Sequence, residues 1–505
     1  MMLTKDDTLT RRAAPLDMPA GEFRAAGHGL VDQIADWLEK LPSGPVTRDE
    51  SPGDVRRALG ADRALPESGT APRELLDEAA DLLFRHSLFN GHPRFFGYIT
   101  SSPAPIGALG DLLAAAINQN VGAWRLSPMA TEIEAQTIRW MAELIGFAPD
   151  AGGLLVSGGN MANFVCFLAA RTAKATSDIR KSGLRSMQPQ FRVYASAETH
   201  TWIQKAADLF GLGTDAIRWI ATDDQQRMVT DALERQIVAD RRSGDLPFLV
   251  VGTAGTVSTG AVDPLAEIAD ICRRHDVWFH VDGAYGALAA RVPGAPESLR
   301  AVADADSVAV DPHKWLYAPL EAGCVLVRRP ADLLRTFSYH PSYYHFDHEV
   351  TNYFDYGPQN SRGFRALKVW LALRQVGLSG YVEMIADDMR LARHLHSLVD
   401  AHPEFEAMTQ HLSITTFRYI PQELRAKCGV PEIEDYLHRL NQDLLTRVER
   451  SGEAFLSNAL VGGRFALRAC IVNFRTSTAD IDALPSLLSR LGRQAHDAMK
   501  GELDQ

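Results

Sequence analysis

Hydrophobic residues recur along this chain with two spacings, and the two alternate through its middle part. Short apolar runs, typical of buried strands, lie at residues 154–156, 191–194, 248–251, 277–281 and 307–310. Segments with apolar residues three and four apart, typical of helices, lie at residues 106–119, 129–145, 161–170 and 202–210. This alternation over residues 104–378 predicts an α/β domain with a mostly parallel central sheet.

The two ends of the chain have different patterns. Residues 23–41 and 73–86 read as amphipathic helices that are too few to enclose a core. We therefore expect residues 1–103 to form a helical arm that packs on a partner subunit. Residues 379–505 predict a small α+β domain, with helices at residues 381–398, 431–450 and 481–499 and strands at residues 413–419 and 465–474.

Composition narrows the class of protein. Of 505 residues, 46% are hydrophobic and 23% are charged, as in ordinary globular proteins, and the formal net charge of −11 argues against nonspecific nucleic-acid binding. The five cysteines show no CxxC pair, which favours reduced thiols. No signal-peptide core and no apolar run of about 18 residues is present, so we expect a cytoplasmic protein without a membrane span.

Candidate chemistry lies where the predicted strands end. Ser157, Gly158, Gly159 and Asn160 form a turn between a strand and a helix, where free amides favour a phosphate, although tight packing alone also explains such a turn. The turn matches neither the dinucleotide nor the P-loop fingerprint.

Two charged residues follow later strands. Asp282 ends the run VWFHV, where a buried carboxylate needs either an ion pair within the fold or a cationic ligand atom. Lys314 follows the strand in SVAVDPHKWLY. Most lysines in such positions are solvated, but a partly desolvated one is a nucleophilic amine that forms a Schiff base.

In chain order these groups are a phosphate turn, a histidine (His200), an aspartate and a lysine. Pyridoxal phosphate requires such a set: a phosphate cup, a side chain that stacks on its ring, an anion for the pyridine nitrogen and a Schiff-base lysine. The motifs SGGNMAN, HVDGAYG and DPHKWLY closely resemble those of the group II pyridoxal-phosphate-dependent amino acid decarboxylases, and within that group the aromatic-L-amino-acid decarboxylases.

The resemblance implies the fold type I, aspartate-aminotransferase-like architecture and a homodimer with active sites at the subunit interface. It also implies pyridoxal 5'-phosphate as the cofactor. Lys314 would bond to the cofactor, Asp282 would pair with its ring nitrogen, and His200 and Ala284 would lie on opposite ring faces. Further cofactor contacts are expected from Gly159, Asn160, Thr256, Asp311 and His313.

The resemblance places a mobile catalytic loop within residues 338–353. Tyr343 would return a proton to the substrate carbon, with the adjacent Tyr344 as the alternative. Three histidines in this stretch lack the spacing and fourth ligand of a zinc site, so we expect no metal. Arg362 matches the family's SRRFRALKLW-like element, whereas Gly363 replaces the usual second arginine.

The side-chain pocket is expected to contain Tyr98, Ser101, Trp124 and Arg362. Tyr98 and Ser101 belong to HPRFFGYITSS, which reads equally well as a core strand, and Trp124 also suits a core position. The resulting hypothesis is decarboxylation of an aromatic L-amino acid to an amine and carbon dioxide. The alternatives are an aromatic aldehyde synthase or a decarboxylase of an acidic or other non-aromatic amino acid, the acidic case if Arg125 points inward.

Overall fold

The computed structural model describes residues 14–184, 189–340 and 350–502. It divides into two compact units, Met1–Phe89 with Arg450–Glu453, and Asn90–Glu449 with Ala454–Gln505. The predicted division placed boundaries at residues 103 and 378. In the second unit, α13 (Ala366–Ala401) is interrupted at Gly377, whose φ of +71° and ψ of 169° are not helical, next to the predicted boundary at residue 378.

The N-terminal unit contains the two predicted helices as α2 (Ala20–Lys40) and α4 (Pro72–Arg85). Trp37 of α2 stacks on Phe84 of α4 with 5.1 Å between ring centroids, which joins the two helices. A third helix, α3 (Pro52–Leu59), was not predicted. It begins with a capping box in which Ser51 and Asp54 bond reciprocally.

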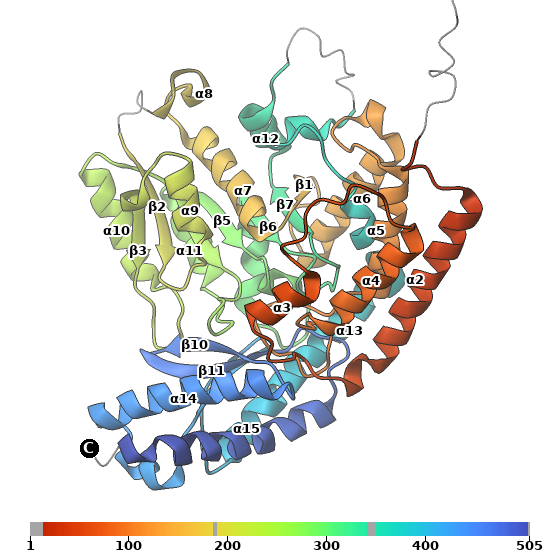
Figure 1. The fold of residues 1–505 in the computed structure, drawn as a ribbon. Coiled ribbons are helices and arrows are strands. Elements are labelled where there is room, and N and C mark those ends of the chain that lie inside the picture. The colour runs from red at the N-terminus through yellow and green to blue at the C-terminus, as the bar shows by residue number, and fades with distance from the viewer. Residues whose placement is uncertain (1–13, 185–188, 341–349, 503–505) are drawn as a thin grey trace, which may run out of the picture. The chain divides into compact units, whose positions relative to one another are not determined.

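The described part of the second unit contains a seven-stranded sheet in the order β1-β7-β6-β5-β4-β2-β3 (Figure 1). Strands β2 to β6 run parallel, and β7 pairs antiparallel with both β1 and β6. The predicted mostly parallel sheet is confirmed. The strands are β1 (Gly152–Val156), β2 (Phe191–Ser196), β3 (Ile217–Ile220), β4 (Leu246–Thr253), β5 (Trp278–Asp282), β6 (Ser307–Val310) and β7 (Gly323–Val327).

Helices pack on this sheet, α7 and α11 among them (Figure 1), so β5, β6 and β7 are buried along their whole length. This explains why these strands read as continuous apolar runs. The helices of this region are α5 (Pro105–Ile117), α6 (Pro128–Ile145), α7 (Gly159–Lys174), α8 (Ile179–Ser182), α9 (Trp202–Leu209), α10 (Thr230–Arg242), α11 (Leu265–Arg274) and α12 (Pro330–Phe337). Short 3-10 turns cover Leu41–Ser43, Trp124–Leu126, Thr214–Ala216, Gly286–Ala289, Glu297–Asp304, Tyr353–Asp355, Gln422–Lys427 and Lys500–Glu502.

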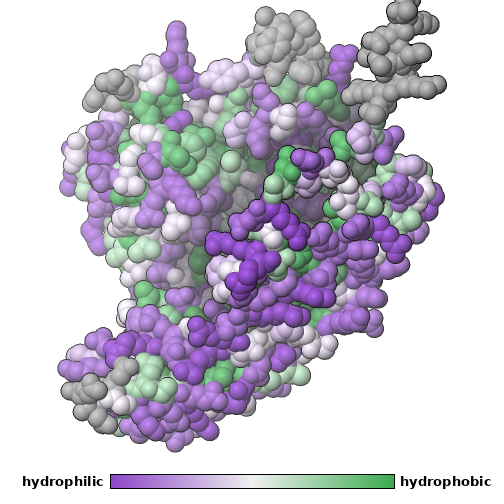
Figure 2. All heavy atoms as spheres, in the orientation of Figure 1, coloured by the Kyte–Doolittle hydropathy of each residue, from purple (hydrophilic) through white to green (hydrophobic). Residues whose placement is uncertain are grey.

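The C-terminal part is the predicted α+β arrangement. An antiparallel sheet in the order β10-β11-β9-β8 packs with α14 (Pro431–Ser451) and α15 (Thr478–Met499) around its own apolar core. Its strands are β8 (Phe405–His411), β9 (Ile414–Tyr419), β10 (Ser457–Val461) and β11 (Arg464–Cys470). Figure 2 shows mostly hydrophilic side chains on the outer surface of α14 and α15.

The segment at residues 92–102 is not a strand, although one interpretation of the sequence made it one. Phe96 donates its N–H to Phe455 O and accepts from Cys470 N, which attaches the segment to the C-terminal sheet by single bonds. Among the helices that the structure describes, none combines the length and the apolar character required to cross a bilayer.

A chain of buried polar groups crosses the central sheet at His280 of β5. Its Nδ1 lies 2.9 Å from Ser307 Oγ and its Nε2 lies 2.7 Å from Asn163 Oδ1. Trp278 Nε1 also donates to Ser307 Oγ at 2.8 Å. These bonds satisfy polar groups that would otherwise be costly inside an apolar sheet.

We expect the stability of this fold to depend on pH through His280. Burial lowers the pKa of His280 to about 4. The unfolded chain, with an ordinary histidine pKa near 6.5, then binds more protons than the folded protein, so stability is fully present above about pH 6.5 and declines below it. The free energy of unfolding, measured with urea, should be lower at about pH 5 than above about pH 6.5 by on the order of 2 kcal/mol. The free energy of unfolding of His280→Gln should fall less over the same pH range than that of the unmodified protein. Equal decreases in the two proteins would contradict this interpretation.

Candidate active site

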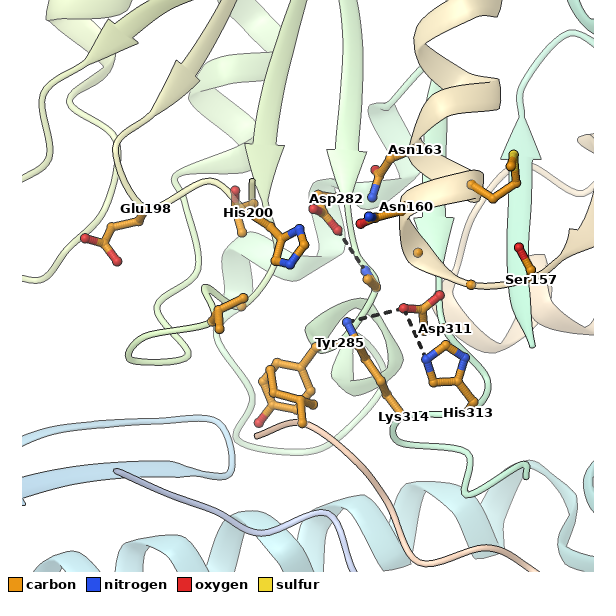
Figure 3. A pocket seen from close by; sticks show the side chains of 18 residues that line it. Ser157, Asn160, Asn163, Glu198, His200, Asp282, Tyr285, Asp311, His313 and Lys314 are labelled. Carbon is orange, nitrogen blue, oxygen red and sulfur yellow. Dashed lines mark hydrogen bonds and ion pairs between the residues drawn. The ribbon is translucent and has the colours of Figure 1, made fainter. Parts of the chain in front are cut away.

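A cavity of about 330 Å³ lies at the carboxyl-terminal edge of the parallel strands (Figure 3). This is the edge at which open α/β sheets bind ligands. The cavity is lined by Ile99, Ser157, Gly158, Gly159, Asn160, Met161, Asn163, Glu198, His200, Thr253, Gly255, Val257, Asp282, Ala284, Tyr285, Asp311, His313 and Lys314. Eight of the residues predicted from the sequence are thus in one place: Gly159, Asn160, His200, Asp282, Ala284, Asp311, His313 and Lys314.

The turn from β1 into α7 forms one wall of the cavity. Gly158 has a φ of +140°, and a Cβ on Gly159 would lie only 2.6 Å from Asp311 Oδ2. Both positions therefore require glycine. No side chain caps the start of α7, so its first amides remain available to an anion in the cavity.

Asp282 ends β5 and is buried, with 7% of its surface exposed. Trp202 Nε1 donates to its Oδ2 at 2.7 Å, and the amide of Ala284 donates to its Oδ1 at 3.3 Å. These donors fix the orientation of the carboxylate and stabilise its negative charge. A protonated ring nitrogen is a suitable partner for such a group.

Lys314 lies in the turn after β6 and faces the same space (Figure 3). Its Nζ is 3.2 Å from Asp311 Oδ2, and His313 Nε2 is 3.7 Å from the same oxygen. Burial lowers the pKa of His313, an effect that Asp311 opposes, and its Nδ1 lies 2.6 Å from Ala322 O. The arrangement places an amine, a carboxylate and an imidazole at one corner of the cavity.

His200 precedes α9 and borders the cavity near Asp282 and Lys314 (Figure 3). Its Nδ1 accepts from the amide of Trp202 at 3.3 Å, which favours the tautomer with the proton on Nε2. Partial burial lowers the pKa of His200, an effect that Asp282 opposes and Lys314 reinforces. The ring is therefore set to be neutral and to present Nε2–H.

Several other predicted residues do not line this cavity. Thr256 is buried with its Oγ1 3.0 Å from Thr259 Oγ1. Ser101 is also buried, and its Oγ donates to His313 O at 2.9 Å, directly behind the lysine turn. Tyr98 is 58% exposed and holds a left-handed φ of +51°.

Trp124, Arg125 and Arg362 lie elsewhere too. Trp124 Nε1 donates to Glu132 Oε1 at 2.9 Å, and Arg125 is exposed. Arg362 is buried in an ion pair with Glu134 at 2.5 Å and donates to Leu155 O at 2.6 Å. Its contacts in this chain therefore support β1 rather than reach the cavity. Tyr343 and Tyr344 lie outside the described residues.

Sequence reasoning missed some cavity residues. Thr253 ends β4, so its place at a strand end was a usable signal, and Tyr285 follows Asp282 by three residues within HVDGAYG. Asn163 lies one helical turn beyond Gly159. Trp202 does not line the cavity but orients Asp282, and it had no signal at all because its contact with Asp282 spans 80 residues of sequence.

Two polar atoms suggest that the cavity is built for a ligand. Asp311 Oδ1 and Thr253 Oγ1 are buried and have no hydrogen-bond partner among the described residues. Buried polar atoms without partners are rare and require explanation. Together with the glycine turn, Asp282 and Lys314, they fit pyridoxal phosphate, which offers a phosphate, a ring nitrogen, a ring hydroxyl and an aldehyde.

Comparison with known proteins agrees with this site. Residues 52–420 match the pyridoxal-dependent decarboxylase conserved domain. An aromatic-L-amino-acid decarboxylase of Bacillus atrophaeus is 35% identical over 92% of this chain and 94% of its own length. Tyrosine decarboxylase 2 of Arabidopsis thaliana is 32% identical over 89% of this chain and 83% of its own.

Solved structures give the same result. The structure of Oryza sativa TDC with PLP and tryptamine superposes with a TM-score of 0.87 at 28% identity, covering 96% of this chain and 99% of that one. Mouse CSAD superposes with a TM-score of 0.86 at 29% identity, covering 93% and 99%. Since the matching domain spans most of the chain and a relative of 35% identity covers 92% of it, this protein belongs to the group II pyridoxal-phosphate-dependent decarboxylases and is an amino acid decarboxylase.

Proposed function

We propose that this decarboxylase acts on aromatic L-amino acids and releases the corresponding amine and carbon dioxide. The observation that carries the reaction is the convergence of Lys314, Asp282 and His200 on one cavity. The aromatic preference is supported by relatives named for aromatic, tyrosine and tryptophan substrates. Arg125 is exposed and away from the cavity, so this chain offers no support there for an acidic substrate.

When bound, pyridoxal phosphate supplies an aldehyde that joins to amines and a ring that accepts the electron pair left by the departing carboxylate. Lys314 would hold the aldehyde carbon through Nζ, and Asp282 would hold a proton on the ring nitrogen. His200 and Ala284 would lie on opposite ring faces. Gly159, Asn160, Asp311 and His313 are proposed as the remaining cofactor contacts, whereas Thr256, also predicted as one, does not line the cavity.

The proton steps follow from the same geometry. With Asp311 Oδ2 3.2 Å away, Lys314 keeps a partner for its positive charge whenever its amine is free. His200 would present Nε2–H towards the substrate and help to fix its orientation. Such positioning selects the bond that breaks. Tyr343 would then return a proton to the substrate carbon.

The substrate pocket and the cell compartment remain proposals. Tyr98, Ser101, Trp124 and Arg362 keep their predicted roles only if further elements complete the pocket, because none of them lines the cavity of its own chain. The cytoplasmic location also stays a prediction.

A homodimer would supply such further elements, and α5 offers a surface for it. Leu109, Leu112, Leu113 and Ile117 of α5 are each 50–54% exposed, and nearby in sequence Met129 is 72% exposed. Large apolar side chains gathered on one helix mark an interaction surface. We propose that a second copy of the chain covers α5.

The first experiment is a substrate screen with purified protein and pyridoxal phosphate. Each standard amino acid, L-DOPA and 5-hydroxytryptophan should be tested while carbon dioxide, amine and hydrogen peroxide are measured together. We expect equal amounts of carbon dioxide and amine from an aromatic substrate, and a loss of at least about 10³-fold in Lys314→Ala because it removes the nucleophile. Turnover of acidic substrates only would contradict the aromatic preference.

We expect Tyr343→Phe to change the product rather than stop the reaction. Without the phenolic proton donor, oxygen competes for the electron-rich intermediate, so amine yield should fall by about tenfold or more while aldehyde, ammonia and hydrogen peroxide rise. Tyr344→Phe is the matched control and should still give amine. The reverse result would assign the role to Tyr344, and an unchanged amine yield in both variants would remove the role from this pair.

The proposed dimer contact of α5 can be tested by placing a charged residue on it. Leu112→Glu should weaken dimerisation by at least about tenfold, because it places a carboxylate in an apolar contact. Leu460→Glu on β10 is the matched control, since Leu460 is 55% exposed and Leu112 is 54% exposed. Analytical ultracentrifugation over a concentration series measures both. Equal dissociation constants for the two variants would rule out α5 as the interface.

A further inference from the structure

Asp388 of α13 is a buried carboxylate that the proposed chemistry does not use. Only 3% of its surface is exposed, and it does not line the active-site cavity. Its Oδ2 accepts hydrogen bonds from Trp315 Nε1 at 2.8 Å and from the hydroxyl of Tyr317 at 2.7 Å. Both donors belong to the turn that carries Lys314. One carboxylate therefore holds two side chains of the lysine turn from behind.

Helix α13 also holds Leu316, the residue between Trp315 and Tyr317. Tyr381, two turns before Asp388 on α13, donates its hydroxyl to Leu316 O at 3.2 Å. Consecutive residues Trp315, Leu316 and Tyr317 are thus each bonded to α13. A helix is a rigid element, so this arrangement transfers its rigidity to the turn.

The turn needs such support because its backbone is strained. Tyr317 holds a left-handed φ of +56°, which is uncommon for a residue other than glycine. Strained conformations of this kind persist only when surrounding contacts determine them. Here Ala104 N donates to Tyr317 O at 2.7 Å, and the bond to Asp388 holds the side chain of the same residue.

Trp315 connects Asp388 to the wall of the cavity. Its ring stacks on Tyr285, with 4.7 Å between centroids and 18° between planes, and Tyr285 lines the cavity. The hydroxyl of Tyr285 is itself held 2.6 Å from Ser413 Oγ. A shift of Trp315 would therefore move both Lys314, its neighbour in sequence, and the wall formed by Tyr285.

The carboxylate is costly at this position, which argues for a specific role. No lysine, arginine or histidine of the described residues forms an ion pair with Asp388, and burial raises its pKa to about 7 against the opposing effect of its two hydrogen bonds. An apolar residue would fill a helix–turn contact without the desolvation cost. Only a side chain that accepts hydrogen bonds can bind both donors of the lysine turn at once.

We propose that Asp388 is a positioning residue of this decarboxylase: through Trp315 and Tyr317 it holds the lysine turn so that Lys314 Nζ stays beside Asp311 in the cofactor cavity. The inference rests on the proposed role of Lys314 as the lysine that bonds to pyridoxal phosphate. Asp388 acts through the turn and touches neither substrate nor cofactor.

The test compares Asp388→Ala with Asp388→Asn, whose amide oxygen still accepts both hydrogen bonds. Asp388→Ala should lower kcat by about ten- to a hundredfold with KM changed by less than about threefold, because misplaced groups slow the chemical step. Asp388→Asn should restore most of kcat. Asp387→Ala is the matched control on the same helix, because Asp387 is exposed and forms its ion pair with Arg390 of α13 rather than a bond to the lysine turn.

A second readout does not depend on turnover. Apoprotein is mixed with pyridoxal phosphate, the bond to lysine is trapped with borohydride over time, and the modified Lys314 peptide is quantified by mass spectrometry. Asp388→Ala should be modified at least about tenfold more slowly than the control, whereas Asp388→Asn should stay close to it. A purely structural role would lower thermal stability without separating these two variants in trapping rate.

The outcomes separate the inference from the function on which it rests. Trapping at another lysine, or turnover in Lys314→Ala, would contradict the role of Lys314 itself. Normal kcat and normal trapping in folded Asp388→Ala would overturn the inference alone. If Asp388→Ala does not fold, Tyr317→Phe removes one donor with the loss of only a hydroxyl, Trp315→Phe removes the other donor and also shortens a buried ring, and unchanged trapping in the double variant overturns the inference.

Discussion

The carboxylate of Asp311 lies where the parts of the site meet. Its Oδ2 is 3.2 Å from Lys314 Nζ and 3.7 Å from His313 Nε2, and it packs so closely on Gly159 that no Cβ fits there. The lysine turn and the glycine turn from β1 into α7 are therefore spaced by one buried side chain. Its second oxygen is buried and has no hydrogen-bond partner among the described residues.

Side chains from several elements support the neighbouring groups of the site. Trp202 orients Asp282, Ser101 holds the carbonyl of His313, and α13 holds the residues after Lys314 through Asp388 and Tyr381. Each support comes from a different element. A site that must select one bond of the substrate requires its groups to be held within fractions of an ångström, and buried polar contacts achieve this at a cost in stability.

These supporting contacts also account for two residues that were predicted to bind substrate but do not line the cavity of a single chain. Arg362, predicted to contact substrate, is buried against Glu134 and Leu155, where it supports the strand that leads into the phosphate turn. Ser101 lies behind the lysine turn rather than in the cavity. Both are close to the site in structure, and both act on its framework. The exposed apolar face of α5 indicates where a second chain would add to it.

The sequence by itself determined the α/β class, the convergence of Gly159, Asp282 and Lys314, and seven of the described strands, whereas β3, β7, β8 and β10 were not predicted. It could do so because apolar periodicity is local and because parallel strands all end at the same edge of a sheet. The tertiary structure alone decided which groups support them. The contacts of Trp202 with Asp282 and of Asp388 with Trp315 span 80 and 73 residues of sequence. In the sheet, β7 lies between β1 and β6, so β1 is next to a strand that is far from it in the sequence. Such contacts depend on how the elements pack in space, and the local spacing of residues does not predict that packing.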